Sequence, residues 1–241
     1  PFIYKLYNGP RIPKSQLRVK TFNVGGSYGN KQTMSVTTLC CAIAAIKTGR
    51  PVKLVLNKHE QFAAYEQRLG SKIRAKIGMT EDGIFNAVQG CWYVDTGCLG
   101  DAVQGQVGVG LGEAQLVMAK CKNWDLDSKV VVTNKAAAGI VRGYGGQELN
   151  SCLARNMAHC MMQADKDPVE CFKKNYVAPG DKYYWRDGLI WQSRGSSHYP
   201  ETMQKAADKF GWKDCWKGWL KPTRIEGRKA YGVGCGVIGN A

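Results

Sequence analysis

Two glycine-rich turns, each placed between a strand-like and a helix-like stretch, limit most strongly how this chain can fold. They are Gly25-Gly26-Ser27-Tyr28-Gly29-Asn30-Lys31 and Arg142-Gly143-Tyr144-Gly145-Gly146. A glycine turn in this position exposes backbone N–H groups and directs a helix N-terminus toward a bound group. Neither turn has the dinucleotide-binding pattern, and the chain has no phosphate-loop lysine motif. One such turn is more often structural, but two of them, each with an aromatic residue and a nearby cation, favour a shared site for phosphate, an oxyanion or a metal–oxo group.

The spacing of apolar residues predicts the elements around the turns. Alternating residues predict strands at 17–24 and 52–56, a pair of strands within 71–96 that turns at 81–83, and a short strand at 129–133. Helical spacing predicts helices at 36–46, at 149–164 and at about 200–210. The glycine-rich stretch 97–114 is more typical of a loop. This mixture predicts an α+β fold with mixed sheets and flanking helices, divided near residue 120 into subdomains 1–120 and 121–241.

Positive charge is concentrated in the first third of the chain. The 241 residues carry 34 Lys and Arg against 19 Asp and Glu, a net charge of +15, and residues 1–76 hold 14 basic residues but only Glu60 and Glu66 as acids. Such a segment indicates an anionic partner, which could be nucleic acid, a phosphate-bearing cofactor or an acidic subunit; a solvated basic face is an equally common alternative. The basic residues do not interleave with aromatics as in a recognisable nucleic-acid module. This counts against a basic nucleic-acid-binding protein, which is kept as the alternative because of the net charge.

The ten cysteines show none of the usual metal-binding spacing. No two of them are separated by two residues, as zinc and iron–sulfur motifs require. Cys40, Cys41, Cys152 and Cys160 fall in apolar helical patterns, so they are predicted to be buried free thiols. No apolar run is long enough to span a membrane, and the first residues lack a signal-peptide layout. We therefore expect no membrane span and a reducing cytoplasm, in an anaerobic host.

The order of motifs over residues 16–237 resembles the molybdenum-binding (molybdopterin) subunit of the xanthine dehydrogenase/aldehyde oxidoreductase family. Beyond the two glycine turns, the resemblance rests on Arg18-Val19-Lys20, Thr48-Gly49-Arg50-Pro51-Val52, Asp82-Gly83, Val132-Thr133-Asn134-Lys135, Gln147-Glu148, Asp167-Pro168 and Lys174-Asn175. It implies an α+β fold in which two subdomains, each with one glycine turn, wrap a molybdopterin cofactor.

The resemblance also implies which residues meet the cofactor. The contacts to molybdenum–molybdopterin, for which the cytosine dinucleotide form is one option, would come from Gly26, Ser27, Tyr28, Gly29, Arg142 and Gly143. Tyr28 and Arg142 would lie close to the molybdenum without being side-chain ligands to it. Arg142 is the catalytic residue that the resemblance implies on this chain.

Three further positions would face the substrate. Tyr144 stands where the family has an aromatic residue that flanks the substrate ring, and Arg68 where purine-oxidising members carry a substrate-orienting arginine. Gln32 stands where those members carry a carboxylate, and an amide cannot accept a proton as a carboxylate does. The resemblance therefore disfavours xanthine and leaves an N-heterocycle, an aldehyde or an aromatic compound as the small-molecule substrate.

The general base of the family, a glutamate in a later Gly-Glu segment, has no counterpart in this sequence. Glu113 stands in the wrong place relative to both glycine turns and is not assigned that role. We therefore expect a second molybdenum-binding subunit to complete the site, with 2Fe-2S and FAD on iron–sulfur and flavin subunits to accept electrons. The prediction is a molybdenum-dependent oxidoreductase subunit that uses water to hydroxylate a carbon centre and is not active alone. A non-catalytic scaffold subunit of the same fold is a further alternative.

Overall fold

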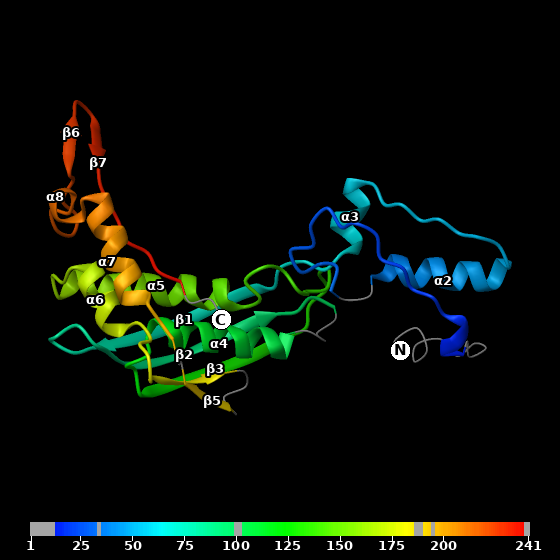
Figure 1. Cartoon of the computed structure of the whole chain (residues 1–241), viewed down its shortest axis with the longest axis horizontal. Helices are drawn as coiled ribbons and strands as arrows, with labels where there is room; N and C mark the ends of the chain where they lie inside the picture. Colours follow the sequence, from blue (N-terminus) through cyan, green and yellow to red (C-terminus); the bar gives the residue numbers. More distant parts are fainter. Residues whose placement is uncertain (1–12, 33–34, 99–102, 186–189, 194–195, 239–241) are drawn as a thin grey trace. The chain divides into compact units, whose positions relative to one another are not determined.

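A computed structural model describes residues 13–32, 35–98, 103–185, 190–193 and 196–238 (Figure 1). These residues form two compact units that interleave along the chain. The first unit takes the described residues up to Leu69, together with 96–98 and 132–142, and the second takes the remainder. The units therefore do not follow halves divided near residue 120, and the assignment of one cofactor-binding subdomain to each half stays a prediction.

The second unit is built on a mixed three-stranded sheet. β1 (Gly70–Met79) and β2 (Phe85–Asp95) form an antiparallel hairpin, and β3 (Asn123–Val131) runs parallel to β2. The hairpin turns at Gly83, which has a φ of 88° and a backbone N–H that donates to the Thr80 carbonyl. Parallel neighbours need a crossover connection, and here it carries α4 (Val103–Val117). The predicted strand pair within 71–96 and the α+β class are confirmed.

Helix α5 (Gly146–Gln163) supplies the apolar face that covers this sheet (Figure 1). It packs on β1 and on α4. Its buried side chains recur at helical spacing, which keeps them on one face of the helix. They are Leu149, Leu153, Met157 and Met161. Together with Phe85, Trp92 and Val94 of β2 they form the core of the second unit.

The prediction that the glycine-rich stretch 97–114 is a loop is wrong, because most of it forms α4. Its glycines allow neighbouring groups to approach the helix closely. A Cβ at Gly110 would lie 2.8 Å from the Gly145 carbonyl oxygen and 3.1 Å from the Trp92 ring. Glycine lowers helix propensity, so contacts of this kind override the local preference of the sequence.

The remainder of the second unit extends from α6 (Pro168–Asn175) through the β4–β5 hairpin (Lys182–Trp185, Ile190–Ser193), α7 (Tyr199–Phe210) and α8 (Trp212–Cys215) to the β6–β7 hairpin (Arg224–Glu226, Lys229–Tyr231). The predicted third helix is confirmed as α7. Helix α6 is not among the helices that the spacing of apolar residues predicted. Asp167-Pro168 begins it: Asp167 Oδ1 accepts from Val169 N at 2.7 Å, and proline suits the first helical position.

The first unit contains η1 (Lys14–Gln16), α2 (Val36–Thr48) and α3 (Lys58–Ala64). The helix predicted at 36–46 is confirmed as α2, with Ser35 as the cap of its start and left-handed Gly49 at its end. The strands predicted at 17–24 and 52–56 are not formed, because neither segment has a ladder partner among the residues that the structure describes. Cys40 on α2 is exposed, contrary to its predicted burial. Among the described helices of both units, none combines the length and apolarity that would let it cross a membrane.

Candidate functional site

The first glycine turn has a backbone that few residues other than glycine adopt. Gly26 and Gly29 have φ angles of 115° and 106°, and Tyr28 between them has a φ of 52°. The turn is closed by hydrogen bonds from Asn30 N to the Ser27 carbonyl at 3.1 Å and from Gln32 N to the Gly29 carbonyl at 3.0 Å. A non-glycine residue in the left-handed region is uncommon and often marks a functional site. The Tyr28 side chain is exposed.

This turn is held against residues 140–142. The Arg142 backbone N–H donates to the Tyr28 carbonyl at 2.7 Å. A Cβ at Gly29 would lie 2.2 Å from the Ile140 carbonyl oxygen, so no other residue fits there without movement of the backbone. The sequence prediction placed Tyr28 and Arg142 at one site, and the structure brings their backbones into direct contact.

Residues 66–68 hold the other side of the same segment. Arg68 Nη2 donates to the Arg142 carbonyl at 2.5 Å, and Glu66 Oε2 accepts from Ile140 N at 3.1 Å. Gln67 pairs with Ala138 in a parallel bridge. Both peptide groups of Arg142 are therefore engaged, one by Tyr28 and one by Arg68, while its side chain is exposed. We call this arrangement of Tyr28, Arg68 and Arg142 the arginine clamp.

A cavity of about 380 Å³ lies beside the arginine clamp, entirely within the first unit. It is lined by Asn30, Lys58, Gln61, Phe62, Tyr65, Glu66, Gln67, Arg68 and Val141. Asn30 Oδ1 is shielded from solvent and has no hydrogen-bond partner among the described residues. A buried acceptor in this state favours a ligand that brings a donor. Gln32, which follows the turn, has an exposed side chain and lies outside this lining.

The second glycine turn belongs to the second unit from Gly143 onward. Gly143, Tyr144 and Gly145 have φ angles of 98°, 38° and 93°, and Gly146 N donates to the Gly143 carbonyl at 2.7 Å. A Cβ at Gly145 would lie 2.0 Å from the Gln106 carbonyl oxygen of α4. The turn is thus packed tightly on α4, and its glycines have a structural role whether or not they bind a ligand.

Glu113 is a buried carboxylate that sequence reasoning left without a role. It is on α4 and lies against Gly146, the first residue of α5, where a Cβ would meet Oε2 at 1.5 Å. The N-terminus of a helix carries partial positive charge, which stabilises a carboxylate there. The pKa of the Tyr176 hydroxyl is raised mainly by burial, then by the neighbouring Tyr199, and in smaller part by the charge of Glu113. Glu113 is the only acid among the apolar and glycine residues of Val103–Val117, and this was the signal in the sequence.

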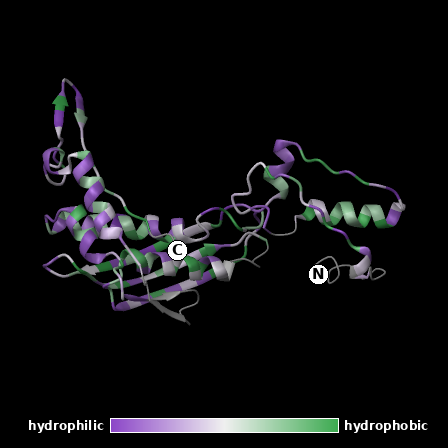
Figure 2. Ribbon diagram, viewed as in Figure 1, coloured by the Kyte–Doolittle hydropathy of each residue, from purple (hydrophilic) through white to green (hydrophobic). Residues whose placement is uncertain are grey.

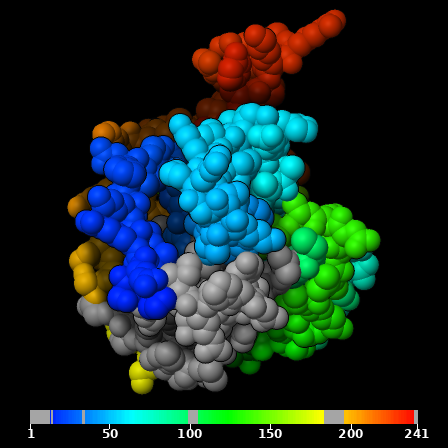
Figure 3. All heavy atoms as spheres, turned by 90° about the vertical axis from the view of Figure 1, so that its right-hand side faces the viewer, coloured from blue at the N-terminus to red at the C-terminus, as the bar shows by residue number. Residues whose placement is uncertain are grey.

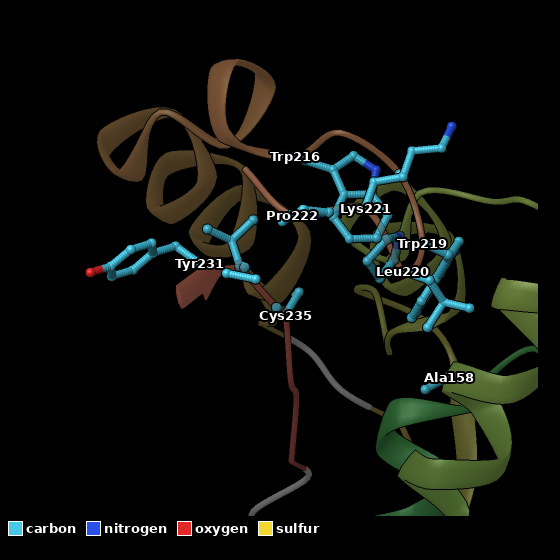
Figure 4. Close-up of a pocket in the computed structure, with 14 residues that line it drawn as sticks. Ala158, Trp216, Trp219, Leu220, Lys221, Pro222, Tyr231 and Cys235 are labelled. Carbon is cyan, nitrogen blue, oxygen red and sulfur yellow. The ribbon is translucent and has the colours of Figure 1, made fainter. Parts of the chain in front are cut away.

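A second cavity, of about 370 Å³, lies near the C-terminal hairpin (Figure 4). Its walls include Trp216, Trp219, Leu220, Lys221, Pro222 and Tyr231. Trp219 Nε1 donates to the Lys166 carbonyl at 2.7 Å, and Trp216 contacts Trp219 edge to face. Figure 4 shows the Tyr231 hydroxyl pointing away from the tryptophans. None of the predicted site residues lines this cavity.

The first glycine turn and the unsatisfied Asn30 Oδ1 beside it favour a ligand-binding protein, and the comparison with protein families identifies the family. The model of the molybdopterin cofactor-binding domain matches residues 5–176. The chain therefore belongs to the molybdopterin cofactor-binding domain family, and the resemblance found in the sequence is confirmed. The match contains both glycine turns and the arginine clamp.

Curated relatives are similar along most of this chain. The large molybdopterin subunit of nicotinate dehydrogenase from Eubacterium barkeri is 29% identical over 201 residues, which cover 82% of this chain and 45% of that protein. The xanthine dehydrogenase molybdenum-binding subunit of Escherichia coli O157:H7 is 28% identical over 84% of this chain and 26% of that protein. The chain thus spans less than half the length of these relatives.

Solved structures show the same fold. Carbon monoxide dehydrogenase from Oligotropha carboxidovorans superposes with a TM-score of 0.69 at 21% identity, over 83% of this chain and 25% of that one. Aldehyde oxidoreductase from Desulfovibrio gigas superposes with a TM-score of 0.64 at 24% identity, over 79% of this chain and 20% of that one. At these identities the likeness concerns the fold.

Proposed function

We propose that this chain binds molybdenum–molybdopterin at the first glycine turn and serves as a subunit of a molybdenum hydroxylase. The reaction would oxidise a carbon centre of an N-heterocycle, an aldehyde or an aromatic compound, with water as the source of oxygen. The observation that carries the proposal is the arginine clamp, which joins Tyr28, Arg68 and Arg142 in a chain of the molybdopterin-binding family.

The residues around the clamp fit such a cofactor. The pterin group offers N–H donors, which match the unsatisfied Asn30 Oδ1, and its phosphate is an anion, which matches the basic side chain of Lys58 beside the same cavity. The close contact at Gly29 leaves the turn no room for a side chain. The cofactor, when bound, supplies the two-electron oxidation, while the protein supplies binding and orientation.

Each residue of the clamp has a defined part in this proposal. The turn of Gly26, Ser27, Tyr28 and Gly29, in which Gly26, Tyr28 and Gly29 have positive φ angles, would present its peptide groups to the cofactor, and Gly143 would continue the contact after Arg142. The exposed guanidinium of Arg142 donates hydrogen bonds near the molybdenum without coordinating it. Because both peptide groups of Arg142 are held, the base of its side chain is fixed before any ligand binds.

Arg68, Gln32 and Tyr144 are proposed as the substrate contacts. Arg68 lines the cavity and orients a polar substituent of the substrate, while Tyr144 flanks its ring. Gln32 offers an amide that both donates and accepts hydrogen bonds but does not take up a proton. This favours a neutral ring or an aldehyde over a substrate whose binding needs a carboxylate.

The remaining parts of the reaction belong to partners. A second molybdenum-binding subunit would bring the general base, and subunits with 2Fe-2S and FAD would accept the electrons. The complex would work in the cytoplasm. The cofactor would be molybdopterin, for which the cytosine dinucleotide form is one option. What supports partner subunits is that these relatives are named as molybdopterin or molybdenum-binding subunits.

The test is anoxic purification of the tagged chain from its native host, followed by measurement of molybdenum, iron and released pterin. We expect all three, together with a second molybdenum-binding chain identified by mass spectrometry. Arg142→Lys should lower turnover at least tenfold, because a point charge replaces the planar fork of donors. The matched control is Arg155→Lys at an exposed position of α5, which should leave turnover unchanged. Absence of molybdenum and pterin from the intact complex would exclude the proposal and favour a scaffold subunit.

A further inference from the structure

We infer that Gly105, in the first turn of α4, is a positioning residue for Tyr144. It leaves the space in which the Tyr144 hydroxyl lies, and so it sets the orientation of the tyrosine ring toward a flat, ring-bearing substrate. This inference rests on the proposed function, because the place of Tyr144 beside the substrate ring belongs to that proposal. Gly105 and Tyr144 both belong to the second unit.

The second glycine turn fixes the backbone of Tyr144. This residue has a φ of 38° between two glycines that also have positive φ angles, and the hydrogen bond from Gly146 N to the Gly143 carbonyl closes the turn. A bulky residue in the left-handed region is uncommon, and such positions gather at functional sites. The Tyr144 side chain is half-buried. The direction of its ring therefore depends on the element against which it packs.

Helix α4 is that element. It packs on α5, at the start of which the turn lies (Figure 1). A Cβ at Gly105 would lie 2.9 Å from the Tyr144 hydroxyl oxygen. The next two residues of the turn also lie against α4, because a Cβ at Gly145 or Gly146 would meet an atom of this helix within 2.0 Å. Helix α4 thus supports the turn, and Gly105 is where it meets the tyrosine side chain.

The helix itself does not require glycine at residue 105. The position is exposed, and alanine forms helices more readily than glycine. The hydroxyl oxygen of Tyr144 is the one neighbouring atom within 3.0 Å of the Cβ position, since the ring atoms Cε1 and Cζ follow at 3.5 and 3.6 Å, an ordinary contact distance. A side chain can give way by rotation, whereas a backbone cannot. Gly105→Ala should therefore displace the tyrosine ring and leave the fold of α4 in place.

The position of the hydroxyl also narrows the substrate class. Because the oxygen of Tyr144 lies against α4, the part of this side chain that remains for a substrate is its aromatic ring. Aromatic rings favour offset or edge-to-face packing on other flat rings. The inference therefore selects an aromatic or N-heterocyclic substrate over an aldehyde without a ring.

The first test is a double-mutant cycle on the stability of the full chain, which needs neither cofactor nor substrate. Gly105→Ala should be less favourable in the natural sequence than in the Tyr144→Phe background, by at least about 0.2 M in the urea midpoint. Gly232→Ala is the matched control, since no atom lies within 4 Å of its Cβ, and it should act equally in both backgrounds. Equal effects of Gly105→Ala in the two backgrounds would overturn the inference.

The second test measures the selectivity of the complex purified anoxically from the native host. Quinoline, nicotinate and benzaldehyde are the ring probes, and acetaldehyde is the probe without a ring. Gly105→Ala should lower kcat/KM for the ring probes by at least about fivefold relative to acetaldehyde, because a small displacement of a positioning group is costly. Addition of Tyr144→Phe should restore at least half of the lost ratio. Failure of the unaltered complex to oxidise any ring probe would refute the substrate class.

The outcomes separate this inference from the function on which it rests. A complex without molybdenum and pterin contradicts the proposed function, while the stability cycle still decides whether Gly105 holds the Tyr144 hydroxyl. A complex with molybdenum and pterin whose Gly105→Ala variant keeps the natural ratio of ring to aldehyde turnover leaves the function standing and refutes the positioning role.

Discussion

The two units of this protein differ in where they keep their apolar side chains. The second unit buries Phe85, Trp92 and the inner face of α5, whereas the buried apolar residues of the first unit, within the described ranges, are Leu69 and Ala138. The first unit instead exposes large apolar side chains such as Val19, Phe22 and Val55. Figure 3 faces the segments that carry them, drawn in blue to cyan, and Figure 2 shows helix α2 of the same unit largely green, the colour of hydrophobic residues. The second unit therefore has a core of its own, whereas the first unit has many large apolar side chains and leaves most of them exposed.

This difference shows that a segment can have a strong helical or strand-like sequence without the stability that packing provides. The helical pattern of α2 is strong enough to be predicted, and its caps are in place, but helices gain most of their stability from packing of an apolar face. We therefore expect mutations in the two units to have unequal effects on unfolding, and the following predictions test that inequality.

The largest effect is expected for truncation of the second core. Trp92 is fully buried, and its Nε1 donates to Ser71 Oγ at 3.0 Å. Trp92→Ala should lower the free energy of unfolding by about 3–5 kcal/mol, from the lost burial and the cavity. The matched change in the first unit, Phe22→Ala, should alter it by less than about 0.5 kcal/mol. Urea denaturation followed by far-UV circular dichroism measures both, and equal effects would refute the contrast.

The two glycine turns give the next prediction. Gly145→Ala puts a Cβ 2.0 Å from the Gln106 carbonyl, so it should destabilise the second unit by about 3 kcal/mol through strain and displacement. Gly29→Ala meets the Ile140 carbonyl and should instead reduce pterin retention by the complex. Gly25→Ala is the control, since no atom lies within 4 Å of its Cβ. Equal pterin content in the Gly29 and Gly25 variants would mean that the clamp does not shape the cofactor site.

Helix caps should show the same inequality on a smaller scale. Asp167 caps α6 and accepts from Trp212 Nε1 at 3.0 Å, so Asp167→Ala should cost about 1–2 kcal/mol of global stability. Asn57 caps α3 in the first unit, and Asn57→Ala should leave the urea midpoint unchanged. A shift of the midpoint by Asn57→Ala as large as that by Asp167→Ala would show that the units unfold together.

The smallest effect concerns alkaline pH. Burial raises the pKa of several thiols of the second unit above the ordinary 9.0; these are Cys121, Cys152, Cys160, Cys171 and Cys235. A raised pKa in the folded state means that folding favours the protonated thiol, so its stabilisation is complete below pH 9 and decreases as pH rises further. The urea midpoint should therefore fall as the pH rises from 9 to 10. A midpoint that rises over this range would contradict the assignment.

The sequence predicted the parts of the fold that depend on local pattern. The β1–β2 hairpin, α2, α5 and α7 follow from alternation, helical spacing and glycine or proline signals. It failed where tertiary contacts decide: α4 forms despite its glycines because close packing on Trp92 and Gly145 requires them. The strands expected at 17–24 and 52–56 failed for the opposite reason, since a strand needs a neighbour that the described chain does not provide.

The resemblance predicted that Tyr28, Arg68 and Arg142 share one site, and the structure joins them by hydrogen bonds, while their roles toward cofactor and substrate stay predictions. Periodicity alone could not show that contact is made through the Arg142 backbone, since residues 68 and 142 are 74 positions apart. The sequence could not predict that Glu113 lies against α5, because this position depends on how α4 and α5 pack. The roles of Gln32 and Tyr144 stay predictions.

The glycines of α4 also have a consequence for the order of folding. Within Val103–Val117 the chain has glycine at 105, 108, 110 and 112, and each costs about 1 kcal/mol of helix propensity relative to alanine. Such a segment cannot nucleate a helix by itself, so it must acquire its shape on a surface already formed by β2 and α5. We expect a peptide of residues 103–117 to be a random coil by circular dichroism, and α4 to form late, as the step that makes the folding of the second unit cooperative.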